Sequence, residues 1–173
     1  MSIRDCDRCI SNTIAGNRCK RTTCKIGKYC AQHLSRELGV CVKKSNIPKA
    51  GFGLFATKDF LVTPTQIRQK KFPKLCKYEG EVINYEELQK RYGNDLAPYT
   101  LQVNKDKYID ARSTQSSVAR YINSNTAPGI KKKYVANAKF TQNQWVVLTK
   151  SVKKGEEFFL SYGKGYWSDK IKR

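Results

Sequence analysis

Short apolar runs, separated by turn residues, recur along most of the chain and predict a mainly β fold. The run at residues 158–160 follows a turn glycine and two carboxylates, and it ends near Tyr162, just before glycine-rich chain. A tyrosine at the end of a buried strand stands where site residues tend to collect, although an interfacial tyrosine is the plainer interpretation. The other runs predict two strands around a turn at residues 39–60, a hairpin at 98–111, and closing strands at 134–139 and 145–150.

Helical signals are concentrated in the stretch that follows Asn84. Asn84 suits the N-cap of a helix, Glu87 follows three residues later, and Gly93 provides the stop. Residues 62–74, by contrast, are basic and predict a long surface loop.

Composition places the chain among ordinary folded proteins, because 39% of its 173 residues are hydrophobic and it has only 11 glycines and 5 prolines. That length supports one compact domain with a small accessory module. No apolar run approaches the roughly 18 residues that a membrane helix needs, and the N-terminus lacks the apolar core of a signal peptide. Seven cysteines without such a signal favour a reducing compartment. The sequence therefore predicts an intracellular protein with no membrane partner.

Charge changes this picture, since 34 Lys and Arg residues against 14 Asp and Glu residues give a net charge of +20. The bases run from Arg4 to Arg173 and are not confined to a tail. Lysines that only solvate the surface would explain the lysine count but not the shortage of acids. A field of this size favours polyanions, so we expect contact with nucleic acid or chromatin.

Cysteines and the single histidine gather in the first 38 residues. Two residues separate Cys6 from Cys9, and two separate Cys30 from His33, a spacing typical of metal knuckles. The chain between these pairs has too few apolar residues to fold unaided, and bound zinc supplies that energy in modules of this size. The candidate zinc ligands are Cys6, Cys9, Cys19, Cys24, Cys30 and His33.

A structural zinc takes four ligands, so six candidates leave the set open. We favour one cysteine of the first pair, then Cys19 or Cys24, then Cys30 and His33. Two zinc ions that share a ligand, and reduced cysteines without a metal, are the alternatives. Cys41 stands in an apolar strand pattern and is expected in the core.

Three ordered motifs resemble those of the SET-domain protein lysine methyltransferases. They read Lys-Ala-Gly-Phe-Gly-Leu-Phe-Ala at residues 49–56, Val-Ala-Arg-Tyr-Ile-Asn-Ser-Asn-Thr-Ala-Pro at 118–128, and Gly-Glu-Glu-Phe-Phe-Leu-Ser-Tyr-Gly-Lys-Gly-Tyr-Trp at 155–167. The resemblance covers residues 40–167. The chain also resembles compact viral SET proteins, because the Cys/His segment is similar to modules ahead of SET domains in large DNA viruses.

The resemblance implies a mainly β (α+β) fold of several short sheets, with a knot-like crossing of residues 120–125 and 161–165. It divides the chain into a zinc module at residues 1–38, a SET domain at 39–167 and a basic tail at 168–173.

For function, the resemblance implies S-adenosylmethionine-dependent methylation of protein lysines. Tyr162 would hold its hydroxyl beside the reacting nitrogen, and Tyr99 would form a second wall of the site. The residues implied to contact the cofactor are Gly51, Phe52, Gly53, Arg120, Tyr121, Asn123, Ser124, Tyr162 and Trp167.

Ser124 is the main departure from the family, which usually has histidine after this asparagine. If the histidine acts through its backbone, the change is tolerable; if its side chain locks the loop, cofactor affinity suffers. The competing hypothesis is therefore a SET-like module that has lost turnover and holds chromatin or packaged DNA.

Charge also bears on the substrate. Histones or other basic DNA-associated proteins would be repelled as free peptides by a chain of net charge +20, but attracted when bound to DNA. Glu86, Glu87 and Asp95, near the predicted helix, are the few acids that could counter this repulsion. We expect nucleosomal DNA as a partner, leave a homodimer open, and expect the protein in the nucleus or at the site of viral DNA or the virion.

Overall fold

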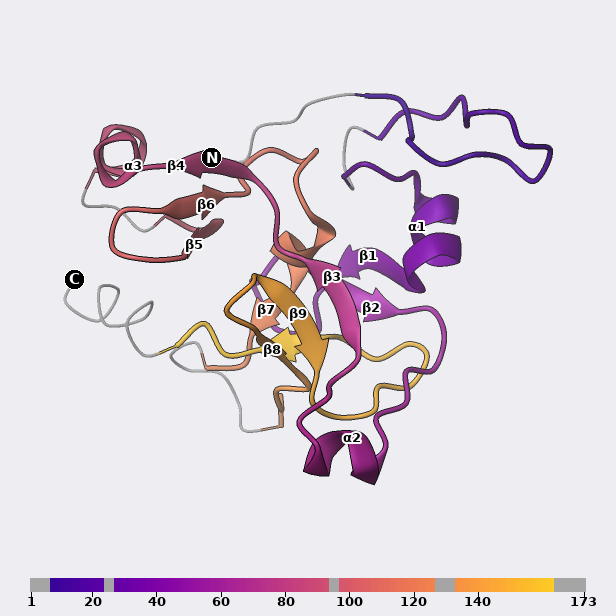
Figure 1. Cartoon of the computed structure of the whole chain (residues 1–173). Helices are drawn as coiled ribbons and strands as arrows, with labels where there is room; N and C mark the ends of the chain where they lie inside the picture. The colour runs from indigo at the N-terminus through magenta and orange to yellow at the C-terminus, as the bar shows by residue number, and fades with distance from the viewer. Residues whose placement is uncertain (1–6, 24–26, 94–96, 127–132, 164–173) are drawn as a thin grey trace.

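The computed structural model describes residues 7–23, 27–93, 97–126 and 133–163 (Figure 1). These residues form a mainly β structure with short helices, as the apolar pattern predicts. In chain order the elements are α1 (Ala31–Leu38), β1 (Val40–Lys44), β2 (Phe52–Ala56), α2 (Pro64–Arg68), β3 (Lys74–Lys77), β4 (Glu81–Ile83), α3 (Tyr85–Tyr92), β5 (Thr100–Gln102), β6 (Tyr108–Asp110), the 3-10 helix η1 (Val118–Tyr121), β7 (Asn123–Ser124), β8 (Ala138–Phe140), β9 (Trp145–Leu148) and β10 (Phe159–Leu160).

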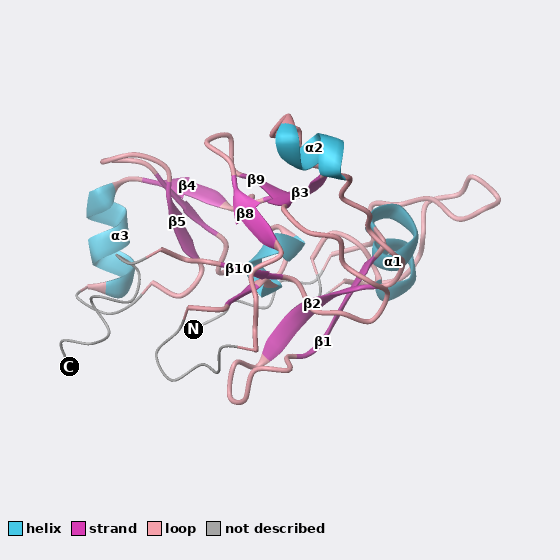
Figure 2. Ribbon diagram, turned by 90° about the horizontal axis from the view of Figure 1, so that it is seen from below, coloured by secondary structure: helices cyan, strands magenta, loops and turns pink. Residues whose placement is uncertain are grey.

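The described strands form four small sheets. β1 pairs antiparallel with β2, two three-stranded antiparallel sheets have the orders β3-β9-β8 and β4-β6-β5, and β10 pairs in parallel with β7. In Figure 2 the β3-β9-β8 sheet lies with α2 at one side of the molecule, α3 lies beside β4 and β5, and α1 lies beside β1 and β2. None of the described helices has the length and apolar character needed to cross a membrane.

The apolar core lies where these sheets meet, so each sheet turns one face toward the others. Its fully buried members include Leu34, Leu54, Ile122, Val146, Leu148, Phe158 and Leu160. The chain therefore buries side chains from α1, β2, β9, β10 and the η1 region in one cluster, which fixes these elements relative to one another.

Helix α3 and both antiparallel hairpins confirm the sequence predictions. The Asn84 side chain accepts a hydrogen bond from the backbone N–H of Glu87 at 2.9 Å, and the Gly93 N–H donates to the carbonyl of Gln89 at 2.7 Å. These two caps satisfy backbone groups that a helix leaves unpaired at its ends.

Two predicted boundaries are wrong. Residues 62–74 are not a loop throughout, because Thr63 and Gln66 form a capping box that starts α2, with Pro64 in the first turn. The closing strand predicted at residues 134–139 begins only at Ala138. The preceding residue, Asn137, binds β10 instead, since its side chain accepts from the Phe159 N–H at 2.9 Å.

Helix α1 joins the N-terminal segment to the main core, although the sequence places a unit boundary at residue 38. Leu34 is fully buried in the main core, while the adjacent His33 lies among the cysteines. Gly39 ends α1 with φ of 68°, a left-handed conformation that suits glycine, and β1 follows at once.

The crossing implied by the resemblance is present as the parallel pair β7 and β10. Asn123 stands opposite Phe159 and Ser124 opposite Leu160. Beyond the pair, the Asn125 N–H donates to the Leu160 carbonyl at 3.1 Å.

Glu157, which precedes β10, is a buried carboxylate that joins three segments of the chain. Its Oε1 accepts hydrogen bonds from Ser45 Oγ at 2.6 Å and Asn123 Nδ2 at 3.2 Å, and its Oε2 accepts from the Asn46 N–H at 2.7 Å. A side chain at Gly53 would collide with this carboxylate, which explains the glycine there. Glu157 therefore ties the turn between β1 and β2 to β7.

We expect Glu157→Gln to lower the free energy of unfolding by about 1–3 kcal/mol, because the amide NH2 would face one of these donors and leave it buried and unpaired. Urea denaturation measures this change.

Glu156→Gln is the matched control, because Glu156 is exposed and an amide oxygen can still accept from the Lys153 N–H. We expect a change within about 0.5 kcal/mol for the control. Equal losses in the two variants would contradict the role given to Glu157.

Candidate active site

A pocket with about 480 Å³ of empty space, its open mouth included, lies beside the crossing of β7 and β10. Its walls come from the chain after β3, the start of β5, the η1 region, the end of β8 and the chain after β10. The lining residues are Tyr78, Pro98, Thr100, Leu101, Ala119, Arg120, Ile122, Phe140 and Tyr162.

Two tyrosines line this pocket, and backbone carbonyls hold both hydroxyls. Tyr162 donates to the carbonyl of Ile122 at 2.8 Å, and Tyr78 donates to the carbonyl of Tyr99 at 2.8 Å. Tyr78 is absent from the site residues expected from the sequence. The Tyr-x-Gly-Glu run at residues 78–81 could have identified it, because this run marks a pocket residue as well as the start of a strand.

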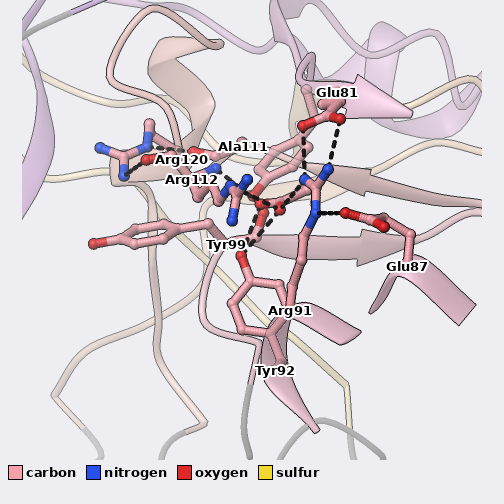
Figure 3. Close-up of polar contacts among 10 residues, drawn as sticks. Glu81, Glu87, Arg91, Tyr92, Tyr99, Ala111, Arg112 and Arg120 are labelled. Atoms are coloured by element: carbon pink, nitrogen blue, oxygen red, sulfur yellow. Dashed lines mark hydrogen bonds and ion pairs between the residues drawn. The ribbon is translucent and has the colours of Figure 1, made fainter. Parts of the chain in front are cut away.

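Arg120 is buried in the pocket wall (Figure 3). Its Nε donates to the Ala111 carbonyl at 2.7 Å and its Nη2 to the Arg112 carbonyl at 3.2 Å. The guanidinium carbon lies 4.0 Å from the ring centre of Tyr99 and 4.9 Å from that of Tyr121. Burial raises the pKa of Tyr121, although the charge of Arg120 acts in the opposite direction.

Through these contacts, Tyr99 and Tyr121 support the Arg120 side chain. Neither is among the residues that line the pocket. The catalytic role expected for Tyr99 and the cofactor contacts expected for Arg120 and Tyr121 stay predictions.

Next to Ala111 in the chain, Asp110 is a fully buried carboxylate at the end of β6. It accepts from Arg91 Nη1 and from the Tyr92 hydroxyl, both at 3.0 Å. Arg91 also pairs with Glu81 and Glu87 at 2.6 Å each, so α3 is fixed to β4 and β6.

Charge and burial shift the pKa values in this cluster. Burial, and then the charge of Asp110, raises the pKa of Tyr92 to about 12. Hydrogen bonds from Arg91 lower the pKa values of Glu81 and Glu87. Glu87 shares Arg91 with Glu81 and Asp110, so one positive charge faces three carboxylates and does not neutralise Glu87. The expectation that Glu87 counters the positive charge near a bound peptide stays a prediction. Asp95 lies outside the described residues.

Several residues expected to contact a cofactor meet at the turn before β2. Asn123 Nδ2 donates to the Phe52 carbonyl at 2.9 Å, and the Phe52 side chain is 63% exposed. Gly51 has φ of 76°, and a Cβ there would meet no atom within 4 Å. Nearby in the chain, Asn125 Oδ1 is buried and accepts no hydrogen bond from the described residues. An exposed ring, open backbone and a buried acceptor together fit a ligand with an apolar face and polar donors.

Ser124 is buried, and its hydroxyl is fully engaged in the crossing. Its Oγ lies 2.9 Å from Thr126 Oγ1, and it accepts from the backbone N–H groups of Thr126 at 3.2 Å and Tyr162 at 3.3 Å. The small hydroxyl therefore links the loop after β7 to the tyrosine after β10. Trp167, the remaining expected cofactor contact, lies outside the described residues.

Four of the expected metal ligands come together near the N-terminus. The sulfur atoms of Cys9, Cys19 and Cys30 and a ring nitrogen of His33 lie within 4.8 Å of one another, and all four residues are buried. Tetrahedral zinc, with Zn–S bonds of about 2.3 Å and Zn–N bonds of about 2.0 Å, needs ligand atoms at this separation. The cluster could hold one zinc ion, and it is one of the favoured sets.

The remaining cysteines do not join this cluster in the described part of the chain. Cys6 and Cys24 lie outside the described residues, and Cys41 is half-buried in β1.

Burial and hydrogen bonds shift the pKa values of the Cys9 and Cys30 thiols in opposite directions. The Cys30 N–H donates to Cys9 Sγ at 3.2 Å. Burial opposes ionisation of Cys30, but hydrogen bonds from the His33 N–H and from Arg21 outweigh it and lower the pKa of Cys30. Burial raises the pKa of Cys9. One thiol of this pair is therefore ready to ionise, as a metal ligand must.

Comparison with known proteins agrees with this architecture. A sequence model of the SET domain matches residues 51–163. A variant-silencing SET domain-containing protein of Plasmodium falciparum (isolate 3D7) is 24% identical over an alignment of 169 residues, and the match covers 87% of this chain and 6% of that protein. The chain thus spans a small fraction of the length of this curated relative.

Solved structures of the Chaetomium thermophilum Polycomb repressive complex 2 share the fold. One gives a TM-score of 0.56 at 24% identity, over 72% of this chain and 15% of that chain. Another, bound to S-adenosylmethionine, gives 0.54 at 23% identity, over 78% and 17%. A third, in complex with H3K27me3 and H3K27M, gives 0.54 at 24% identity, over 72% and 14%. None of these three nor the Plasmodium relative is viral, so the viral resemblance stays a prediction.

Proposed function

Because the chain belongs to the SET-domain family, we propose that it is an S-adenosylmethionine-dependent protein-lysine N-methyltransferase. The observation that carries the proposal is the pocket lined by Tyr78 and Tyr162 beside the β7–β10 crossing. A concave site with apolar walls and a few fixed polar groups suits the long side chain of lysine. The turn that contains Gly51 and Phe52 and the Asn123 amide support a cofactor site that meets this pocket from the other side of the crossing.

The cofactor would be held by backbone at Gly51, by the exposed ring of Phe52 and by the polar groups of Asn123 and Asn125. When bound, it supplies a methyl group on a positively charged sulfur, which an amine can accept by in-line displacement. The residues of this chain have to orient the amine and keep it neutral, since no strong base is needed for such a transfer.

The pocket has groups that can orient the amine and groups that can keep it neutral. A hydroxyl that donates to a carbonyl, as those of Tyr78 and Tyr162 do, can still accept a hydrogen bond from an amine and so fix its direction. The buried guanidinium of Arg120 disfavours a second positive charge in the same pocket, which lowers the pKa of an incoming lysine. The apolar side chains of Leu101, Ile122 and Phe140 exclude water. These residues would therefore hold a neutral amine, already deprotonated by solvent, with its lone pair free to accept the methyl group that the bound cofactor would supply.

We expect Tyr162→Phe to reduce methyl transfer at least about tenfold while the fold is retained, because one fixed hydroxyl beside the amine is lost. Transfer of a radiolabelled methyl group to histones or nucleosomes measures the activity, and thermal unfolding checks the fold.

Tyr85→Phe is the matched control, because this tyrosine is exposed on α3 and its ring packs against Tyr108. The control should keep normal activity. Full activity in Tyr162→Phe would remove Tyr162 from its role. No transfer by the unmodified protein to any histone substrate would favour the competing module without turnover.

We further propose a structural zinc ion bound by Cys9, Cys19, Cys30 and His33. The four-ligand set is complete without an open position, which is typical of structural sites. The metal would stabilise the segment before α1, whose own apolar content is low, and through α1 the main core.

We expect purified protein to contain about one zinc ion per chain, since four protein ligands fill one tetrahedral site. Cys9→Ser should lose the metal and lower the melting temperature, whereas Cys41→Ser, outside the cluster, should keep it. Elemental analysis and thermal unfolding with and without a chelator check both. The segment before residue 38 should unfold first on chelation; metal-free active protein would contradict the proposal.

The substrate we propose is a histone or another basic protein on DNA, and the proposed location is the nucleus. The PRC2 structure in complex with H3K27me3 and H3K27M supports a histone by analogy. Electrostatics favours the DNA-bound form, since the chain carries +20 and the few acids near α3 are too small in number to offset that charge. A free basic tail therefore meets repulsion that nucleosomal DNA would reverse.

We expect faster methylation of nucleosomes than of a free histone-tail peptide at low salt, with this preference shrinking as salt rises and screens the charges. Rates on both substrates at two ionic strengths measure the effect. An equal or peptide-favouring ratio at low salt would contradict it.

A further inference from the structure

A strongly basic surface lies away from the pocket walls described above, on α2 and the outer face of the β3-β9-β8 sheet. We define this basic face by the exposed residues Arg68, Lys70, Lys71, Lys74 and Lys139. α2 and the three strands lie together in Figure 2, at its top. None of the five side chains forms an ion pair within the part of the chain that the structure describes.

The sequence explains why no acid neutralises this face. Residues 60–78, which supply α2 and β3, contain no Asp or Glu. Residues 111–155, which supply β8 and β9, contain none either. The 14 acids of the chain are therefore excluded from both stretches that build the surface, while bases are retained.

Lys74 and Lys139, the two lysines on the sheet, are held in place by contacts with neighbouring side chains. Lys74 and Lys139 both stand opposite Val147 on the central strand, so the three side chains share one row across the sheet. The Lys74 ammonium lies 4.7 Å from the Trp145 ring centre, and the Lys139 ammonium lies 4.2 Å from that of Phe72. Val147 is buried although it belongs to this row, as expected if lysine stems cover it. Such ordering reduces the entropy lost when the charges bind a partner.

The chemistry of the face fits a polyanion with regularly repeated charge. Its ammonium groups are point charges on one side of the sheet, and the backbones of Lys74 and Lys139, two strands apart, are separated by about 9.5 Å across the sheet. A phosphate backbone offers closely spaced charges to such an array, and it binds without any need for a deep pocket.

We propose that the basic face binds the phosphate backbone of duplex DNA without reading its sequence. Direct binding does not depend on catalysis, whereas its use in presenting a substrate rests on the proposed methyltransferase function. The same strands connect the two sites: β3 leads into Tyr78 and β8 ends at Phe140, whose rings meet edge to face at 5.6 Å in the pocket wall. DNA on this face is thus held in a fixed direction relative to the pocket.

The test measures binding of the full zinc-loaded chain to fluorescent 20-base-pair DNA duplexes of two unrelated sequences, over a range of salt concentrations. In the test variant, Lys70, Lys71, Lys74 and Lys139 are each changed to Gln. Loss of four phosphate contacts should weaken binding at least about tenfold and reduce the slope of log affinity against log salt by about 3.6. Both duplexes should behave alike.

The control variant changes four exposed lysines from other elements to Gln, so the net charge changes equally. They are Lys20, Lys44, Lys105 and Lys107. The control should keep most of the affinity and lose less than about one unit of slope. Both variants should melt at the temperature of the unmodified protein.

Equal weakening by the two variants would overturn the proposal, because net charge and not this face would then explain binding. Tighter binding of an RNA duplex of the same length would overturn the assignment to DNA. If the enzyme is active, the test variant should lose activity on nucleosomes and keep it on a free peptide. A chain without methyltransferase activity would remove the proposed function, and the binding measurements would still decide this inference.

Discussion

The central constraint on this structure is the burial of the Glu157 carboxylate among hydrogen-bond donors from distant segments. A buried charge is costly unless donors surround it, and here Ser45, the Asn46 N–H and Asn123 do so. Because these donors come from the turn before β2 and from β7, the carboxylate fixes the turn against the crossing. The adjacent Phe158, Phe159 and Leu160 are buried, so the apolar core holds the same segment from its other side.

A second buried carboxylate, Asp110, similarly joins distant segments near Arg120 of the pocket wall. Asp110 holds Arg91 and Tyr92 of α3, and the carbonyls just after it, at Ala111 and Arg112, hold Arg120. Glu157 thus orders the side expected to bind the cofactor, and Asp110 orders the side expected to bind the substrate. In a chain with so few acids, two of them are buried where the elements of the candidate site meet, and the acid-free stretches are left to form the basic face.

Short sequence motifs correctly predicted the features that depend on residues close together in the chain. α3 follows from Asn84 and Gly93, and the spacing of the cysteines narrowed the candidate ligands to sets that include the Cys/His cluster seen in the fold. α2 was predictable in the same way from Thr63 and Gln66, but basic composition favoured a loop. The partners of Glu157 could not be found locally, since they lie 34 to 112 residues away in the chain.

Tyr78 illustrates the same limit on the site. Its place in the pocket depends on contacts with the distant residues Tyr99 and Phe140, and a period of two along one strand carries no such information.

Helix α1 connects the Cys/His cluster rigidly to the main core. His33 and Leu34 are adjacent, yet the first lies in the Cys/His cluster and the second in the main core, so α1 cannot shift without disturbing both. Gln115, close to η1, adds a second connection, since its Nε2 donates to the Thr23 carbonyl at 2.8 Å. The Cys/His cluster is thus linked through α1 to the main core and through Gln115 to the chain just before η1, which carries Arg120. The N-terminal segment is accordingly part of the support of the candidate active site, although its sequence reads as a separate module.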